Sequence, residues 1–267
     1  MKNTDATQAI EDLSAFALET VQAAGREAME FYGRNRTSVK FDEDLVTQAE
    51  LHLRGFFQER LQACFGGHRI FPVQDMDGAY SHGEQRYLWV FDPIDGVDNF
   101  QAGIPVWGMS LALYDNFWPL FGYFLMPATG DLYRARAGQG AFWRDQAIAA
   151  QPRAAVDDES QLLVYSRFHK HFTASFPGKI RNFGCAAAHI CYVAMGRADA
   201  AVIANESFQD LAALRIVVEG AGAKIFRLDG SVLALGDYLN GEKIAEPLIV
   251  CAPDNFEPVV KCLDRQG

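Results

Sequence analysis

Two aspartates, three residues apart, directly follow a continuous apolar run. The run YLWVF at 87–91 has the length and composition of a buried strand and leads straight into DPIDG at 92–96. The proline blocks a helical backbone, so the carboxylates of Asp92 and Asp95 and the carbonyl of Ile94 can converge on one point. Hard oxygen ligands of this kind suit Mg²⁺, which usually keeps waters or a substrate phosphate as its other ligands.

The residues after the second aspartate are suited to bind a phosphate. Gly96 precedes a short helix expected over 97–102, and the amides of Gly96 and Val97 would lie at its positive end beside the cation. The alternative is a strand-to-helix turn in which Asp92 and Asp95 serve only as caps.

The composition is that of an ordinary globular protein. The chain has 267 residues, of which 49% are hydrophobic and 22% charged. This length suits one large domain or two smaller ones that share a core. The net charge is −10, from 24 basic and 34 acidic residues, which argues against nucleic acid or an anionic membrane as partner. A small anionic ligand stays possible, because a bound cation can reverse the local charge.

Cysteine usage and hydropathy favour a cytoplasmic location. The five cysteines are scattered and form no C-x-x-C pair, as is typical of a reducing compartment. Residues 1–14 are polar and acidic, without the apolar core of a signal peptide. The longest apolar stretch, 106–126, is interrupted by Asp115, Asn116 and Pro119, which predicts two strands and a turn rather than a membrane span.

Periodicity predicts helices and strands that cluster differently in the two halves of the chain. Helices are expected at 8–32, from a capping box formed by Thr47 and Glu50 onward, and at 97–102, 185–196, 208–219 and 255–264. Strands are expected at 87–91, 106–114, 118–125, within 131–144, and at 161–165, 199–204, 223–227 and 247–252. Residues 74–85 suggest a mobile loop, and 151–160 a boundary between halves 1–150 and 151–267 of one compact unit. This arrangement favours a layered α/β or α+β sandwich.

Beyond these patterns, five segments resemble the inositol monophosphatase family and occur along the chain in the family's order. Members of this family are Mg²⁺-dependent phosphomonoesterases of the sugar-phosphatase superfamily. FDPIDGVDN at 91–99 is similar to the family's D-P-[IL]-D-G-[TS]-x-N motif. The other matching segments are DLVTQAE at 44–50, GQGAF at 138–142, GCAA with VAMGRADA at 184–200, and QDLAA with EGAG at 209–222. The resemblance implies an αβαβα layered sandwich, a homodimer and a small phosphorylated ligand.

By the same resemblance, Asp92, Asp95 and Asp210 match three metal-ligating carboxylates, and the Ile94 carbonyl matches a fourth ligand. Asp210 also fits a capping box with Ser207, and the two roles are compatible. Glu50 stands where the family has an aspartate that helps to activate water. Its alternative role is the capping box with Thr47.

Three positions depart from the family pattern where the family activates its water. Val73 and Gln74 replace the two glutamates of G-E-E, and Val97 replaces the hydroxyl residue after D-P-x-D-G. Valine can neither ligate Mg²⁺ nor hold a water by a hydrogen bond. One weak Mg²⁺ site, on Asp92, Asp95 and Asp210, is therefore expected. The second site is left with Asp92 and the Ile94 carbonyl, so the two-metal clamp is lost.

Two substitutions could compensate. Asp75 follows Val73 by two residues and could supply a ligand, and Asp98 could act as a base. Ile203 stands where the family has a glutamate that contacts inositol hydroxyls, which argues against an inositol phosphate as substrate. Asn205 and Glu206 lie nearby and either face the pocket or, as we expect, are exposed turn residues.

Two functions follow from these residues. The favoured hypothesis is a catalytically impaired member, a pseudoenzyme that retains a partial Mg²⁺ and phosphate-ligand site. The alternative is an active Mg²⁺-dependent phosphomonoesterase on a small sugar, inositol or nucleotide phosphate with a modified water-activating site.

Overall fold

The computed structural model describes residues 2–34, 41–72 and 83–266. Its helices are α1 (Lys2–Ala28), α2 (Glu43–Phe65), α3 (Val97–Ala102), α4 (Ala186–Ala194), α5 (Phe208–Gly220) and α6 (Phe256–Val260). Its strands are β1 (Arg69–Ile70), β2 (Tyr87–Asp95), β3 (Gly108–Asp115), β4 (Trp118–Met126), β5 (Asp131–Arg136), β6 (Ala141–Trp143), β7 (Gln146–Ile148), β8 (Gln161–Val164), β9 (Phe172–Ala174), β10 (Lys179–Arg181), β11 (Ala200–Ile203), β12 (Lys224–Phe226), β13 (Leu248–Cys251) and β14 (Leu263–Arg265).

The strands form two large sheets and one small one. The first sheet has seven strands in the order β1 to β7, and only its first pair is parallel. The second sheet has the order β10-β8-β11-β13-β12, with parallel pairing among its first three strands. Strands β9 and β14 form a separate antiparallel pair. Sequential antiparallel connections join β2 to β7 in the first sheet, whereas crossovers through α4 and α5 connect strands of the second.

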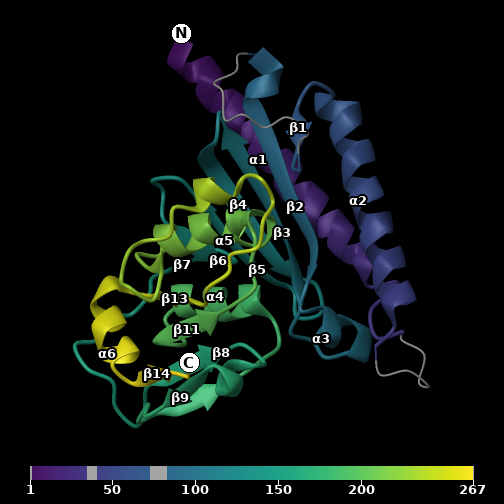
Figure 1. The fold of residues 1–267 in the computed structure, drawn as a ribbon. Coiled ribbons are helices and arrows are strands. Elements are labelled where there is room, and N and C mark those ends of the chain that lie inside the picture. Colours follow the sequence, from purple (N-terminus) through teal and green to yellow (C-terminus); the bar gives the residue numbers. More distant parts are fainter. Residues whose placement is uncertain (1, 35–40, 73–82, 267) are drawn as a thin grey trace.

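The elements stack in layers, as Figure 1 shows. Helices α1 and α2 cover one face of the seven-stranded sheet, and α4 and α5 lie between the two large sheets. The outer face of the five-stranded sheet packs against α6 and the β9–β14 pair. The predicted αβαβα layered sandwich is confirmed, although its last layer mixes a short helix with a two-stranded sheet.

Successive side chains along the strands of the second sheet point alternately to its two faces, and both faces are covered. In β11, Ala201 and Ile203 pack into the cluster that contains α4 and α5, whereas Ala200 and Val202 pack into the outer cluster. All four side chains are buried. A strand buried on both faces requires a continuous apolar sequence, which β11 and β13 have.

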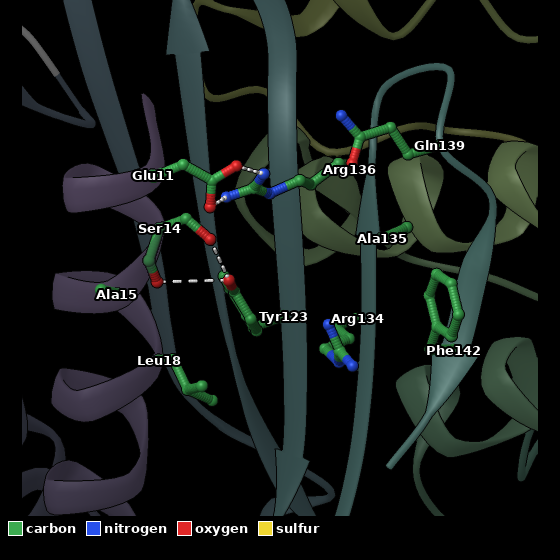
Figure 2. A pocket seen from close by; sticks show the side chains of 10 residues that line it. All are labelled: Glu11, Ser14, Ala15, Leu18, Tyr123, Arg134, Ala135, Arg136, Gln139 and Phe142. Atoms are coloured by element: carbon green, nitrogen blue, oxygen red, sulfur yellow. Dashed lines mark hydrogen bonds and ion pairs between the residues drawn. The ribbon is translucent and has the colours of Figure 1, made fainter. Parts of the chain in front are cut away.

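Helix α1 is fixed to the seven-stranded sheet by polar contacts as well as by apolar ones. Figure 2 shows the Ser14 and Tyr123 hydroxyls 2.6 Å apart and the Glu11 carboxylate paired with the Arg136 guanidinium. A cavity of about 370 Å³ lies between these groups, and the side chain of Arg134 lines it from β5.

The first two helices begin and end at other residues than predicted. Helix α1 ends at Ala28 rather than at 32, because the chain turns there and the rings of Tyr32 and Trp107 come into contact. Helix α2 begins at Glu43, capped by Asp42, whose carboxylate accepts a hydrogen bond from the Leu45 amide at 3.2 Å. The predicted capping box at Thr47 is therefore wrong, because an earlier capping residue starts the helix one turn before it.

The C-terminal helix is shorter than predicted. Helix α6 covers only Phe256–Val260, and the chain then extends into β14, which pairs with β9. The remaining predicted elements occur within a few residues of their expected positions, including α3 at 97–102 and α5 from 208. Of the predicted loop at 74–85, only 83–85 lie within the described residues, in a 3₁₀ turn.

Helix α5 approaches the seven-stranded sheet closely because β4 carries a glycine at the contact. A Cβ atom on Gly122 would lie 2.5 Å from the Ala213 carbonyl oxygen and 2.9 Å from its Cα. The backbone of α5 therefore lies directly on β4, and this contact sets the depth at which the N-terminal end of α5 meets β2.

We expect Gly122→Ala to lower the free energy of unfolding by about 1–3 kcal/mol, because the helix must move away from the sheet. Gly55→Ala is the matched control. A Cβ at Gly55 in the middle of α2 would have no neighbour within 4 Å, so this change should stabilise by roughly 0.5–1 kcal/mol. Chemical denaturation of both variants measures the difference, and equal stabilities would contradict the described contact.

Candidate functional site

A bulge at the end of β2 positions the first two predicted ligands. Asp92 pairs with Ser110 and Asp95 with Gly108, so β2 advances one residue more than β3 between the two pairs. Pro93 lies in this bulge, where its missing N–H interrupts no regular ladder bond. Both aspartates are thus held at the end of one buried strand.

Gly96 ends β2 and caps α3 with a backbone that a larger residue would adopt only with strain. Its φ is 81°, and a Cβ there would lie 3.0 Å from both the Val106 carbonyl oxygen and the Cys185 Cβ. The chain therefore passes tightly between β3 and α4 before α3 begins.

The carboxylate of Asp95 is turned toward the N-terminal end of α4. Its Oδ2 accepts a hydrogen bond from the Ala187 amide at 2.5 Å and one from the Cys185 thiol at 3.3 Å. Burial raises the pKa of Asp95, the two hydrogen bonds oppose that rise, and the charge of Asp210 adds to it. Asp95 thus links β2 to α4.

Asp210 lies in the first turn of α5 and forms the predicted capping box with Ser207. Its Oδ2 accepts hydrogen bonds from the Ser207 amide at 2.7 Å and hydroxyl at 2.9 Å, and from Lys243 Nζ at 2.9 Å. The neighbouring Gln209 donates to the Phe91 carbonyl at 3.1 Å, which ties the start of α5 to β2.

Asp92 lacks such compensation. It is 9% exposed, and its carboxylate makes no hydrogen bond to the described residues. Burial raises the pKa of Asp92 well above its usual value, the charges of Asp210 and Asp95 raise it further, and the charge of Arg54 opposes this rise. The negative charge of Glu50 on α2 adds a smaller contribution to the raised pKa of Asp92.

A fourth carboxylate, that of Glu206, joins this group, although the sequence favoured an exposed turn over a position facing the pocket. Burial raises the pKa of Glu206 well above its usual value, and the charges of Asp95, Asp210 and Asp92 add to the rise, opposed by Lys243. The prediction of an exposed turn residue is therefore wrong for Glu206, whereas Asn205 is exposed as expected. The signal available was its position directly before the capping serine of α5, where the chain reverses beside Asp210.

We call Asp92, Asp95, Glu206 and Asp210 the carboxylate cluster. Lys243 contributes a positive charge at its edge. Although partial burial lowers the pKa of Lys243, the hydrogen bond and charge of Asp210 raise it overall.

The other predicted site residues lie around the cluster in different ways. Val97 is half-buried and packs against the core between α1, α2 and the sheet. The exposed carboxylate of Asp98 accepts a hydrogen bond from Gln101 at 3.4 Å. The Ile94 side chain is buried. The substitutions at Val73 and Gln74 and the compensating Asp75 lie outside the described residues.

The cluster is not assembled as a finished metal site. Within residues 2–34, 41–72 and 83–266, no group of three carboxylate, thiol or imidazole side chains is placed to hold one ion. The hydrogen bonds given above explain this, because the Asp95 carboxylate is turned to α4 and the Asp210 carboxylate to Ser207 and Lys243.

No helix in the described part of the chain combines the length and apolarity that a membrane span requires.

Comparison with known proteins agrees with this architecture. The family model for the inositol monophosphatase family matches residues 9–261. The chain belongs to the inositol monophosphatase family. A histidinol-phosphatase of Chlorobaculum parvum is 29% identical over 228 residues, which cover 80% of this chain and 85% of that protein. An inositol-1-monophosphatase of Mesorhizobium japonicum is 25% identical over 250 residues, covering 88% and 93%.

The fold is also that of solved family structures. An inositol monophosphatase from Thermotoga maritima superposes with a TM-score of 0.74 at 24% identity, covering 94% of this chain and 96% of that one. Members of the family act on small phosphorylated molecules and generally use Mg²⁺. In this member, the four carboxylates of the cluster lie where β2, α4 and α5 meet.

The raised pKa values predict how the metal-free protein responds to pH. Asp92 and Glu206 hold their protons more tightly when folded than when unfolded, where carboxyl groups titrate near about 4. The free energy of unfolding should therefore fall as pH rises from that value through the folded-state pKa values. Thermal or urea unfolding with a chelator present, across this range, measures the fall.

Glu206→Gln should flatten this pH dependence and stabilise the metal-free protein at pH 8. Glu59→Gln is the matched control, because Glu59 is exposed on α2 and should leave the profile unchanged. Identical profiles for wild type and Glu206→Gln would contradict the burial of this carboxylate among like charges.

Proposed function

We propose that this protein binds Mg²⁺ and a small phosphate monoester at the carboxylate cluster and hydrolyses the ester poorly or not at all. The observation that carries the proposal is the burial of Asp92 among like charges without a hydrogen bond from the described residues. Burying ionised carboxylates together costs free energy unless a cation neutralises them.

The chemistry of the donor set fits a hard divalent cation. We propose Asp92, Asp95 and Asp210 as carboxylate ligands and the Ile94 carbonyl as a further one, since Mg²⁺ takes oxygen ligands and retains waters. Asp95 and Asp210 already have partners within the protein. Their displacement would lower the affinity, which supports one weak site rather than two. When bound, the ion would supply positive charge to phosphate oxygens.

The tight turn into α3 is the proposed phosphate contact. The amides of Gly96 and Val97 begin this helix, directly after Asp95. Amides at a helix start favour an anion. A small phosphorylated molecule bound there would reach both the amides and the ion. A homodimer and a cytoplasmic location stay predictions.

The proposed impairment concerns water activation. Val97 offers no hydroxyl, and Val73 and Gln74 offer no carboxylate where the family pattern has these groups. Glu50 and Asp98 are the proposed catalytic carboxylates. Of these, Glu50 acts electrostatically on Asp92, whereas Asp98 contacts Gln101. Loss of a positioned general base typically costs about 10²–10⁴-fold in rate.

An active phosphomonoesterase is the second candidate, and Glu206 is the observation that favours it. Its buried carboxylate adds an acidic group to the cluster. It could replace the carboxylate that Val73 does not provide. In that case Glu206 would take part in binding the ion or in orienting water.

The test is Mg²⁺-dependent phosphate release from inositol, sugar, histidinol and nucleotide monophosphates. The proposal predicts little or no turnover by the wild type and a gain of at least about 10²-fold in Val73→Glu/Val97→Thr, because a metal ligand and a hydroxyl are restored. Efficient wild-type turnover that is lost in Asp95→Asn and Glu206→Gln would contradict the impairment and establish the second candidate.

Removing Lys243 should strengthen Mg²⁺ binding, because its ammonium pairs with a proposed ligand. The side chains of Lys243 and Asp210 are 54% and 26% exposed, so their pair is worth about 0–1 kcal/mol. We expect Lys243→Met to lower the Mg²⁺ dissociation constant by up to about fivefold in calorimetric titration. Lys261→Met, which alters an exposed lysine directly after α6, is the control. Weaker binding in Lys243→Met would contradict Asp210 as a ligand.

A further inference from the structure

A second cavity lies beside the loop that carries Glu206. Its volume is about 300 Å³. Ten residues line it: Tyr165 directly after β8, His171, Ala204, Asn205, Lys243, Ile244, Ala245, Pro247, and Arg265 and Gln266 at and after the end of β14. None of the ten is an aspartate or glutamate, although the chain as a whole has a net charge of −10. Three of them, His171, Lys243 and Arg265, are basic. The lining therefore has the opposite charge to most of the protein.

Lys243 connects this cavity to the carboxylate cluster. It lines the cavity, and its Nζ lies 2.9 Å from Asp210 Oδ2. The next residue, Ile244, donates its amide hydrogen to the Glu206 carbonyl at 2.7 Å, which fixes this segment against the loop between β11 and α5. The side chain of Lys243 thus lies between the cavity and a molecule bound at the carboxylate cluster.

The cavity also offers hydrogen-bond donors, and one of them, unlike Lys243, is not paired with an acid of the described residues. Arg265, at the end of β14, forms no ion pair with the described residues. Its charge acts on Tyr165, which lines the cavity from the end of β8. The Tyr165 hydroxyl lies 2.7 Å from His171 Nδ1. A guanidinium, an ammonium and this pair are groups that bind phosphates and carboxylates.

We propose that this cavity is a subsite for a second anionic group of the substrate. The ligand is then a phosphate monoester that carries a further phosphate or carboxylate several bonds away. This inference rests on the proposed function, because the first phosphate is the one bound at the carboxylate cluster.

Lys243 makes the two sites interdependent. An anionic group in the cavity competes with Asp210 for the ammonium and so leaves Asp210 more available to a cation. Binding of the second anionic group and binding of Mg²⁺ should therefore strengthen each other, as thermodynamic linkage requires.

Phosphonates, whose C–P bond is not hydrolysed, test the subsite without depending on turnover. We would measure dissociation constants by calorimetry, with Mg²⁺ present, for three series with two- to six-carbon chains. These are ω-hydroxyalkyl phosphonates, ω-carboxyalkyl phosphonates and alkane-1,ω-bisphosphonates. At the chain length that spans the two sites, we expect at least one anionic series to bind tenfold or more tightly than the hydroxyl series. The carboxylate and bisphosphonate arms tell which anionic group the cavity prefers.

Arg265→Gln and Lys243→Met should each bring the ratio of the dissociation constants of the hydroxyl and anionic series close to one. The control Lys261→Met, at an exposed residue, should retain the wild-type ratio. Equal binding of the three series at every length would overturn the subsite while leaving the proposed function intact. A preference that persists in both variants would overturn its assignment to this cavity. If no phosphonate binds, the proposed function and the subsite fall together.

Discussion

The gathering of four carboxylates, with Asp92 buried and Asp95, Glu206 and Asp210 half-buried, is the constraint on which the rest of the site depends. Three chain segments bring them together: the bulged end of β2, the N-terminal end of α4, and the loop and capping box that begin α5. The apolar layers on either side hold these segments in place, and Gly122 lets α5 lie against the sheet at the required depth. The apolar core thus enforces an electrostatic repulsion that an exposed site would avoid, and such destabilisation is common where binding requires it.

The protein relieves this repulsion only in part. Asp95 uses amide and thiol donors of α4, and Asp210 uses Ser207 and the ammonium of Lys243. Asp92 has no hydrogen bond from the described residues, and the charge of Arg54 offsets its raised pKa only in part. Because Asp95 and Asp210 have hydrogen-bonding partners within the protein, the carboxylates gather without all being oriented to bind one ion. It also explains why a bound cation would have to compete with partners that the chain itself supplies.

Local signals predicted the parts of the site that are continuous in sequence. The apolar run before Asp92, the short helix after Gly96 and the capping box at Ser207 are each formed by adjacent residues, and the structure has all three. The cap at Thr47 was mispredicted because Asp42 caps the helix about one turn earlier, through the Leu45 amide. Local signals favoured an exposed Glu206 and gave no role to Lys243. Charged residues in polar stretches are normally exposed, and the contact of Lys243 with Asp210 spans 33 positions of the chain, which only the folded structure brings together.

The most direct test of this account is the melting temperature of the chelator-treated protein, measured before and after Mg²⁺ is added at pH 8, for wild type and for Asp92→Asn. If the cluster needs a cation, Mg²⁺ should raise the melting temperature of the wild type. Asp92→Asn should melt higher than the wild type without Mg²⁺ and gain little from its addition. A wild-type melting temperature that does not respond to Mg²⁺, together with a destabilised Asp92→Asn, would contradict the account. The cluster would then be a structural feature rather than a site for a cation.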